Sequence, residues 1–299
     1  MKSKKFLSLL MMSFAALMMS ACEKDPISPQ SDNEMNATED AAESIASAIG
    51  AENGGAADQL SDVVELASIG RIQGQADYLL GKYSEANAVA TIDTSYDPAT
   101  GTWTLKLQRE RGNPDGVPYA QISRTYTYQF LNKNGQPQKY WKVGVDTAYT
   151  IKFNIVEGTG THRTQHISQQ LKSLSGAFTV TGVNTRIVTV NGTYQRAAVD
   201  TITTRNSVRT LDHSLSLTFT EVKGPRGGHH RSEMARKFSG TISGTYNANV
   251  TFQRGESYSE KTINRTFSVV LGDGNADLDI RGLKFRCDLI LGELIRFGR

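Results

Sequence analysis

Apolar and polar residues alternate along most of the chain after about residue 86. A period of two predicts β-strands that bury one face and expose the other, as antiparallel sheets do. The longest apolar row holds Phe238, Ile242, Tyr246, Ala248, Val250 and Phe252. Threonine, serine, asparagine and glutamine fill most of the positions between such rows. We therefore predict an antiparallel β domain over residues 86–299.

The links between the predicted strands are short, so successive strands are expected to pair as a meander of roughly twelve strands. A strong hairpin signal, Asn191-Gly192, lies between two of them. A sheet this large must curl, close or split. Because Gly240 and Gly244 fall on an apolar face, we predict a curved, barrel-like sheet, open or closed; a β-sandwich is the alternative. The same alternation also suits an outer-membrane barrel, but the uneven strand lengths weigh against it.

Residues 38–85 follow a different spacing. Thr38 can cap a helix and Gly50 can end it. After Gly54-Gly55, apolar residues recur at helical intervals in Leu60, Val63, Val64 and Ala67. We predict two short helices that pack on the β domain, since they are too short to be stable alone.

The first 21 residues have the three-part composition of a secretory signal. Three lysines at positions 2, 4 and 5 precede an apolar run from Phe6 to Met19, and small residues follow. The run is too short and wrongly flanked for a lasting membrane span. Residues 1–21 are therefore predicted to be a signal peptide, and the polar residues 22–37 a flexible tether.

The end of this segment, Met19-Ser20-Ala21-Cys22, resembles the lipobox of bacterial lipoproteins. The resemblance covers the signal alone. It implies cleavage before Cys22 and attachment of acyl chains at Cys22, which would hold the protein on a membrane. It further implies a place in the bacterial cell envelope, at the outer membrane rather than the inner one, with the membrane face left open.

Charge is unevenly distributed. Residues 23–100 hold 15 acidic and three basic residues, whereas residues 101–299 hold 15 acidic and 27 basic residues. The mature chain is formally neutral, because the excess of positive charge lies in the signal peptide. The net charge of the mature chain therefore gives no reason to expect a nucleic-acid partner.

With Cys22 lipidated, Cys287 is the one cysteine left, so neither an intrachain disulfide nor a cysteine-based metal site is predicted. Cys287 lies on an apolar row and is expected to be a buried thiol. His213 also falls on an apolar row, which is typical of a hydrogen-bonded core histidine. His162 and His166 could share a face and bind a metal ion if they lay on a helix, but on an extended chain they would stand too far apart to chelate together.

The segment 223–237 is the most basic part of the sequence. Its candidate anion-binding residues are Lys223, Arg226, His229, His230, Arg231, Arg236 and Lys237. In an envelope such a loop could bind lipopolysaccharide phosphates or an acidic glycan, while a solvated hairpin loop is the plainer alternative. Asp273, Asn275 and Asp277 begin like a calcium loop, but the glycine and glutamate that such a loop needs later are missing, so a hairpin turn is favoured.

Motifs of catalysis are missing from the sequence: it has no G-x-S-x-G, no H-E-x-x-H, no P-loop and no dinucleotide-binding glycines. We predict no catalytic residue, metal or cofactor. The expected function is a non-enzymatic binding or interaction module. The alternatives are a carrier for lipid or another apolar ligand, and a hydrolase of envelope polymers whose carboxylates come from distant strands.

Overall fold

A computed structural model describes residues 29–51, 54–72, 89–117, 119–163, 167–203, 205–227 and 231–295. The chain divides into two compact units, Met1–Glu39 and Asp40–Arg299. The first unit contributes the beginning of helix α2 (Pro29–Ile49). The second unit holds the rest of α2, the other described helices and every described strand.

The described strands form one antiparallel sheet of 13 strands and a separate two-stranded ladder, β5 (Lys142–Val143) with β6 (Asp146–Thr147), which lies in a connection. The main path of the sheet is β1 (Val89–Asp97), β2 (Thr102–Gly112), β3 (Tyr119–Leu131), β7 (Thr150–Arg163), β8 (Ile167–Thr181), β9 (Ile187–Thr203), β10 (Val208–Pro225), β11 (Ser239–Arg254), β12 (Ser257–Gly272), β13 (Asn275–Ile280), β14 (Leu283–Asp288) and β15 (Glu293–Leu294). Strand β4 (Pro137–Gln138) pairs with β3.

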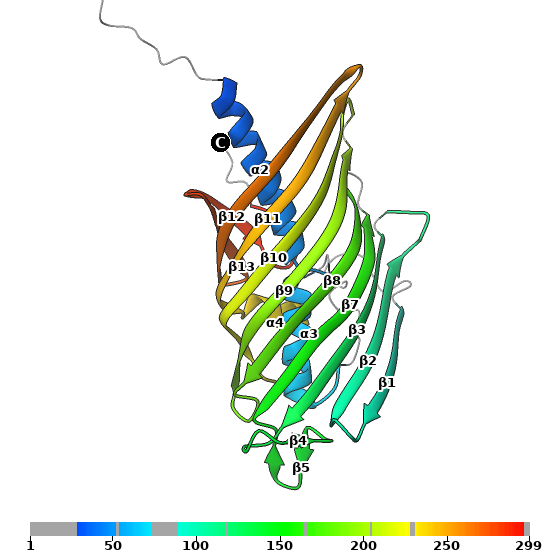
Figure 1. Cartoon of the computed structure of the whole chain (residues 1–299), viewed down its shortest axis with the longest axis vertical. Helices are drawn as coiled ribbons and strands as arrows, with labels where there is room; N and C mark the ends of the chain where they lie inside the picture. The colour runs from blue at the N-terminus through cyan, green and yellow to red at the C-terminus, as the bar shows by residue number, and fades with distance from the viewer. Residues whose placement is uncertain are drawn as a thin grey trace, which may run out of the picture. The chain divides into compact units, whose positions relative to one another are not determined.

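The order of strands confirms the predicted mainly β fold with a meander. Long strands that follow one another in the chain are neighbours in the sheet, even where the link holds further elements, as between β3 and β7 and between β10 and β11. The sheet curves along its long central strands, as Figure 1 shows, and its two ends, β1 and β15, do not pair with each other. The sheet is therefore open rather than closed.

The alternation of residues along the strands matches the predicted burial. In β11, Ile242, Tyr246, Ala248 and Val250 are buried, whereas the serines, threonines and asparagines between them are exposed. The register joins the apolar rows of neighbouring strands: Leu215 of β10 stands opposite Tyr246, and Phe219 stands opposite Ile242. The core thus lies on the concave side of the sheet.

The hairpin predicted at Asn191-Gly192 is wrong. Both residues lie inside β9, and the chain turns instead near Gly182–Thr185. At this point the pairing of β9 with β10 shifts register, and the Asn191 side chain accepts a hydrogen bond from the Glu221 N–H (2.8 Å). A Cβ on Gly192 would lie 2.1 Å from the Ala177 carbonyl oxygen. The glycine therefore serves close packing at a bulge and not a turn.

Helix α3 (Ala56–Ile69) ends at Gly70, whose φ of 75° gives the left-handed cap that favours glycine. This agrees with the second predicted helix. Helix α2 (Pro29–Ile49) ends before Gly50 as predicted, but it begins at Pro29 and not at Thr38. Part of the predicted tether is therefore helical. Proline suits the first turn of a helix, and acidic residues near that end favour the helix dipole, although the segment lacks apolar periodicity.

In the part of the chain that the structure describes, no helix is long and apolar enough to cross a bilayer.

Candidate functional site

The concave side of the sheet carries charged and polar side chains among its apolar ones. Six of them are less than 10% exposed: Arg109, Arg124, Gln169, Arg196, Asp200 and His213. Helix α3 lies against this side and is buried from Ala56 to Ser68. Buried charges are stable only when they are paired or hydrogen-bonded, so the partners of these groups define the candidate site.

Arg109 of β2 binds two carboxylates of α3. Its Nη1 lies 3.1 Å from Asp58 Oδ1, and its Nη2 lies 2.6 Å from Asp62 Oδ1. The two aspartates are four residues apart and so share one face of the helix. Asp58 also lies in the first turn of α3, where a negative charge is favoured. One guanidinium therefore fastens the start of the helix to the sheet.

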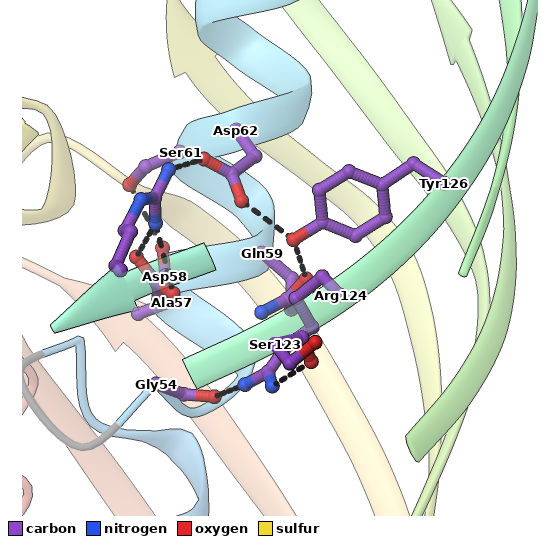
Figure 2. A network of polar contacts seen from close by, with 10 residues as sticks. Gly54, Ala57, Asp58, Gln59, Ser61, Asp62, Ser123, Arg124 and Tyr126 are labelled. Carbon is purple, nitrogen blue, oxygen red and sulfur yellow. Dashed lines mark hydrogen bonds and ion pairs between the residues drawn. The ribbon is translucent and has the colours of Figure 1, made fainter. Parts of the chain in front are cut away.

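Tyr126 of β3 extends this contact, as Figure 2 shows. Its hydroxyl oxygen lies 2.7 Å from Asp62 Oδ2 and 2.7 Å from Gln59 Oε1, and its single proton serves one of them at a time. Burial raises the pKa of Tyr126 well above its ordinary value, and the nearby Asp62 carboxylate raises it further. Tyr126 therefore stays protonated and acts as a hydrogen-bond donor.

Two further arginines donate hydrogen bonds to backbone carbonyls, one in the turn between α2 and α3 and one in α2 itself. Arg124 donates through Nη2 to the Gly54 carbonyl (3.1 Å) and through Nη1 to the Thr159 carbonyl (2.9 Å). Arg196 donates to the Ala48 carbonyl (3.5 Å), which belongs to the last turn of α2. A cation there satisfies a carbonyl that the helix leaves without a partner and favours the helix dipole. Burial lowers the pKa of Arg124.

A third group of buried residues joins β8, β9 and β10. Gln169 donates to Asp200 Oδ1 (2.8 Å) and accepts a hydrogen bond from Arg196. His213 Nε2 lies 3.1 Å from Asp200 Oδ2. The prediction of a hydrogen-bonded core histidine is confirmed.

Asp40 anchors α2 to strands in the later half of the sheet. Its Oδ2 lies 2.9 Å from Lys261 Nζ of β12, and its Oδ1 pairs with Arg209 of β10. Ion pairs thus reach α2 and α3 from both halves of the sheet. This arrangement, which we name the helix clamp, consists of Asp40, Asp58, Asp62, Arg109, Tyr126, Arg124, Arg196, Asp200 and His213.

We expect the stability of the protein to fall in acid partly because Asp200 becomes protonated. Burial alone would raise the pKa of Asp200, but its hydrogen bond to His213 and the charges of His213 and Arg196 lower it below the ordinary 3.8. A carboxylate with a lowered pKa stabilises the folded state above pH 3.8, and this contribution is lost as the pH falls through the folded-state pKa.

The measurement is urea unfolding of the protein and of Asp200→Asn from neutral pH downwards. The difference in unfolding free energy between them should shrink below about pH 4. Asp146→Asn, at an exposed position, controls for the loss of one negative charge. A difference that stays constant over this range would contradict the lowered pKa.

The segment 223–237 is not one solvated loop. Lys223 lies at an exposed position of β10, and helix α4 (Arg231–Arg236) follows. Met234, Ala235 and Phe238 are buried, so the segment packs on the domain. Arg226 lies over the ring of Trp141 at 5.5 Å and donates to the Val183 carbonyl. Arg236 and Lys237 are exposed.

The remaining residues of the predicted anion-binding loop are only partly placed. His229 and His230 lie outside the described residues, and of Arg231 the structure describes the backbone alone. Of the described cations, Arg226 lies over the ring of Trp141. The anion-binding role stays a prediction.

The remaining candidate residues from the sequence lie on strands, in a turn or in the core. His162 lies at the end of β7, and His166 is outside the described residues. Asp273 and Gly274 form the turn between β12 and β13, as predicted. Cys287 is buried, and burial raises the pKa of its thiol to about 12. Among the described residues, no group of three or more histidines, cysteines and acids could hold a metal ion.

Sequence reasoning missed the helix clamp, although the sequence contains a signal for it. Arg109, Arg124 and Arg196 occupy the same parity as the apolar residues of their strands, next to Leu107, Tyr126 and Tyr194. A charged residue within an apolar row predicts a buried partner. The partner itself could not be identified without the fold.

Comparison with known proteins adds no relative: no family model matches the chain, and no curated protein or solved structure matches it.

Proposed function

We propose that this chain is a lipoprotein of the bacterial cell envelope, held on the membrane through acylated Cys22, and that its β domain is a non-enzymatic binding or interaction module. The lipobox-like end of the signal segment supports the anchor. The open sheet supports the binding role, because such a sheet offers a broad face and two ends to partners.

The observation that carries the binding role is the filling of the concave side. Helix α3 and the clamped part of α2 cover it, held by ion pairs of Arg109 with Asp58 and of Lys261 with Asp40, so much of the described concave side is taken up by the protein's own helices. The convex side is exposed and polar. Along β11, for example, it presents Ser239, Thr241, Ser243, Thr245, Asn247 and Asn249. A partner would therefore meet the convex side or the ends of the sheet.

The alternative of an apolar-ligand carrier requires a cavity on the concave side with Gly240 and Gly244 in its wall. Both glycines are instead tightly packed. A Cβ on Gly244 would lie 2.5 Å from the Ser216 carbonyl oxygen, and one on Gly240 would lie 2.7 Å from the Glu221 carbonyl oxygen. A carrier would thus need α3 to leave the sheet, which would expose the charges of the clamp.

The alternative of a hydrolase needs an accessible pair of carboxylates or a histidine in a cleft. The closest described candidates are Asp58 with Asp62 and Asp200 with His213, and all four are at most 5% exposed. They are also occupied by Arg109, Tyr126, Gln169 and Arg196. Burial and these contacts favour a structural role for both pairs of residues.

The anchor is tested by metabolic labelling of cells that produce the full chain, using a fatty acid with an alkyne tag. We expect the label on the wild-type protein and its complete loss in Cys22→Ser, because the sulfur that carries the diacylglycerol is gone. Cys287→Ser is the matched control and should keep the label, since that thiol is buried. Label that persists in Cys22→Ser would refute the lipoprotein assignment.

An anionic envelope glycan or the phosphates of lipopolysaccharide are the proposed ligands of segment 223–237. Lys223→Glu/Lys237→Glu should lower the affinity for lipopolysaccharide by about tenfold or more, because two attractions become repulsions. Lys106→Glu/Lys172→Glu makes the same change of charge on exposed positions of β2 and β8 and should have a small effect. Equal losses in both variants would mean that the protein binds through net charge alone.

A further inference from the structure

One end of the sheet carries apolar side chains that project into solvent. They belong to the connection between β3 and β7, which includes the short ladder of β5 (Lys142–Val143) and β6 (Asp146–Thr147). Figure 1 shows β5 beyond the ends of the long strands, at the lower edge of the picture. Val145, at the turn of this hairpin, is 91% exposed, and Val143 and Tyr140 are 52% and 57% exposed.

The base of the hairpin is fixed to the domain. The Trp141 indole N–H donates to the Ala67 carbonyl of α3 (3.0 Å). The Ala148 N–H donates to the Trp141 carbonyl (2.8 Å), which closes the hairpin below its tip. Val143 and Val145 are therefore exposed on a hairpin whose base is hydrogen-bonded to the domain, and not at a frayed loop end.

Basic residues outnumber acidic ones in the connection that carries the tip. The connection 132–149 contains Lys133, Lys139 and Lys142 and a single acid, Asp146. Lys139 lies over the rings of Tyr96 and Tyr140 at 5.2 and 5.3 Å. Arg226, which lies over Trp141, adds positive charge on the neighbouring connection. The tip is thus apolar and its surroundings are cationic and aromatic.

We propose that this hairpin tip, residues Tyr140–Val145, inserts into the surface of an anionic phospholipid bilayer. The side chains of Val143 and Val145 would enter the boundary between headgroups and acyl chains, and Tyr140 suits the interface. Lys142 and the adjacent Lys139 would pair with headgroup phosphates. A protein partner would need a pocket shaped to receive Val145. A bilayer needs no such pocket to accept an isolated apolar tip. This contact is independent of acylation at Cys22 and would orient the domain on the membrane.

The test is co-sedimentation of the mature chain, residues 22–299 with Cys22→Ser, with vesicles of phosphatidylcholine alone or mixed with phosphatidylglycerol. Without acyl chains, any binding comes from the protein itself, so failure here is separate from failure of the lipoprotein proposal. We expect binding to the mixed vesicles, weaker binding to the neutral ones, and weakening by salt.

Val143→Ser/Val145→Ser should lower the partition coefficient by about tenfold, because two apolar side chains no longer leave water. The matched control is Val156→Ser/Val270→Ser, which alters two valines that are 55% and 56% exposed elsewhere on the domain, and it should bind as the wild type does. Lys139→Gln/Lys142→Gln should remove most of the preference for phosphatidylglycerol.

Three results would overturn the proposal: a wild-type chain that binds neither kind of vesicle, a tip variant that binds as tightly as the control, or equal binding to neutral and anionic vesicles. The first would leave a protein partner as the occupant of the tip. Circular dichroism checks that the variants keep their fold, which we expect since the changed positions are exposed.

Discussion

Replacement of Arg109 by methionine is expected to lower the free energy of unfolding by about 3–5 kcal/mol, among the largest effects of any single change in this protein. Methionine keeps much of the volume of the side chain but removes its charge. Asp58 and Asp62 would then be buried without the cation that both contact, at 3.1 and 2.6 Å. Leaving one partner of a buried ion pair alone costs more than the pair contributes.

Urea unfolding followed by circular dichroism measures this loss. Lys172→Met is the matched control, because it breaks an ion pair with Asp212 in which both side chains are about half exposed. Such surface pairs contribute about 0–1 kcal/mol. If both variants lost the same small amount, the contact between Arg109 and α3 would not hold the helix on the sheet.

A triple variant separates the charge from the packing. Asp58→Asn and Asp62→Asn, added to Arg109→Met, remove the uncompensated charges together with the arginine. Replacing a whole buried ionic group is often close to neutral, so the triple variant should recover much of the lost stability. No recovery would show that Arg109 acts mainly by filling space.

Phe153→Ala is the second change with a large expected effect, a loss of about 3–5 kcal/mol. Phe153 of β7 is fully buried, and its ring lies between those of Tyr126 and Phe178 at centroid distances of 4.8 and 6.4 Å. The row continues to Phe219 through Phe178. Alanine would leave a cavity that the stiff neighbouring strands cannot fill.

The matched control is Phe252→Ala near the end of β11. Phe252 belongs to an apolar row by sequence, but its side chain is half-buried and lies under Arg209 at 5.8 Å. Its loss should therefore be clearly smaller than that of Phe153. Equal losses in thermal and urea unfolding would mean that the core extends to the ends of the long strands.

The polar contacts of the concave side explain why helix α3 adopts one position on the sheet. Apolar residues of α3 such as Leu60 and Val63 supply burial but fit many orientations. The paired contacts of Arg109 with Asp58 and Asp62, and of Arg124 with the Gly54 carbonyl, fit one register of the helix on the sheet. Buried ion pairs are weak evidence for stability, and fixing a register is the use for which they are best attested.

The sequence by itself determined the parts of the fold that depend on neighbours along the chain. The period of two placed Leu215, Phe219 and Tyr246 on the buried side, since alternate residues of a strand face opposite sides of a sheet. Short links between most of the strands favoured a meander, and helical spacing located α3 and the end of α2. Cys287 and His213 were correctly expected to be buried because they stand in apolar rows.

Only the tertiary structure decided what meets across the chain. Arg109 contacts residues 47 and 51 positions earlier, and Arg196 reaches a carbonyl 148 positions earlier. No local pattern encodes such pairs. Asn191-Gly192 illustrates the same limit: the dipeptide suits a turn, but pairing with two long neighbouring strands made it a bulge. Local preferences contribute about 1 kcal/mol each, and the burial of a whole sheet face outweighs them.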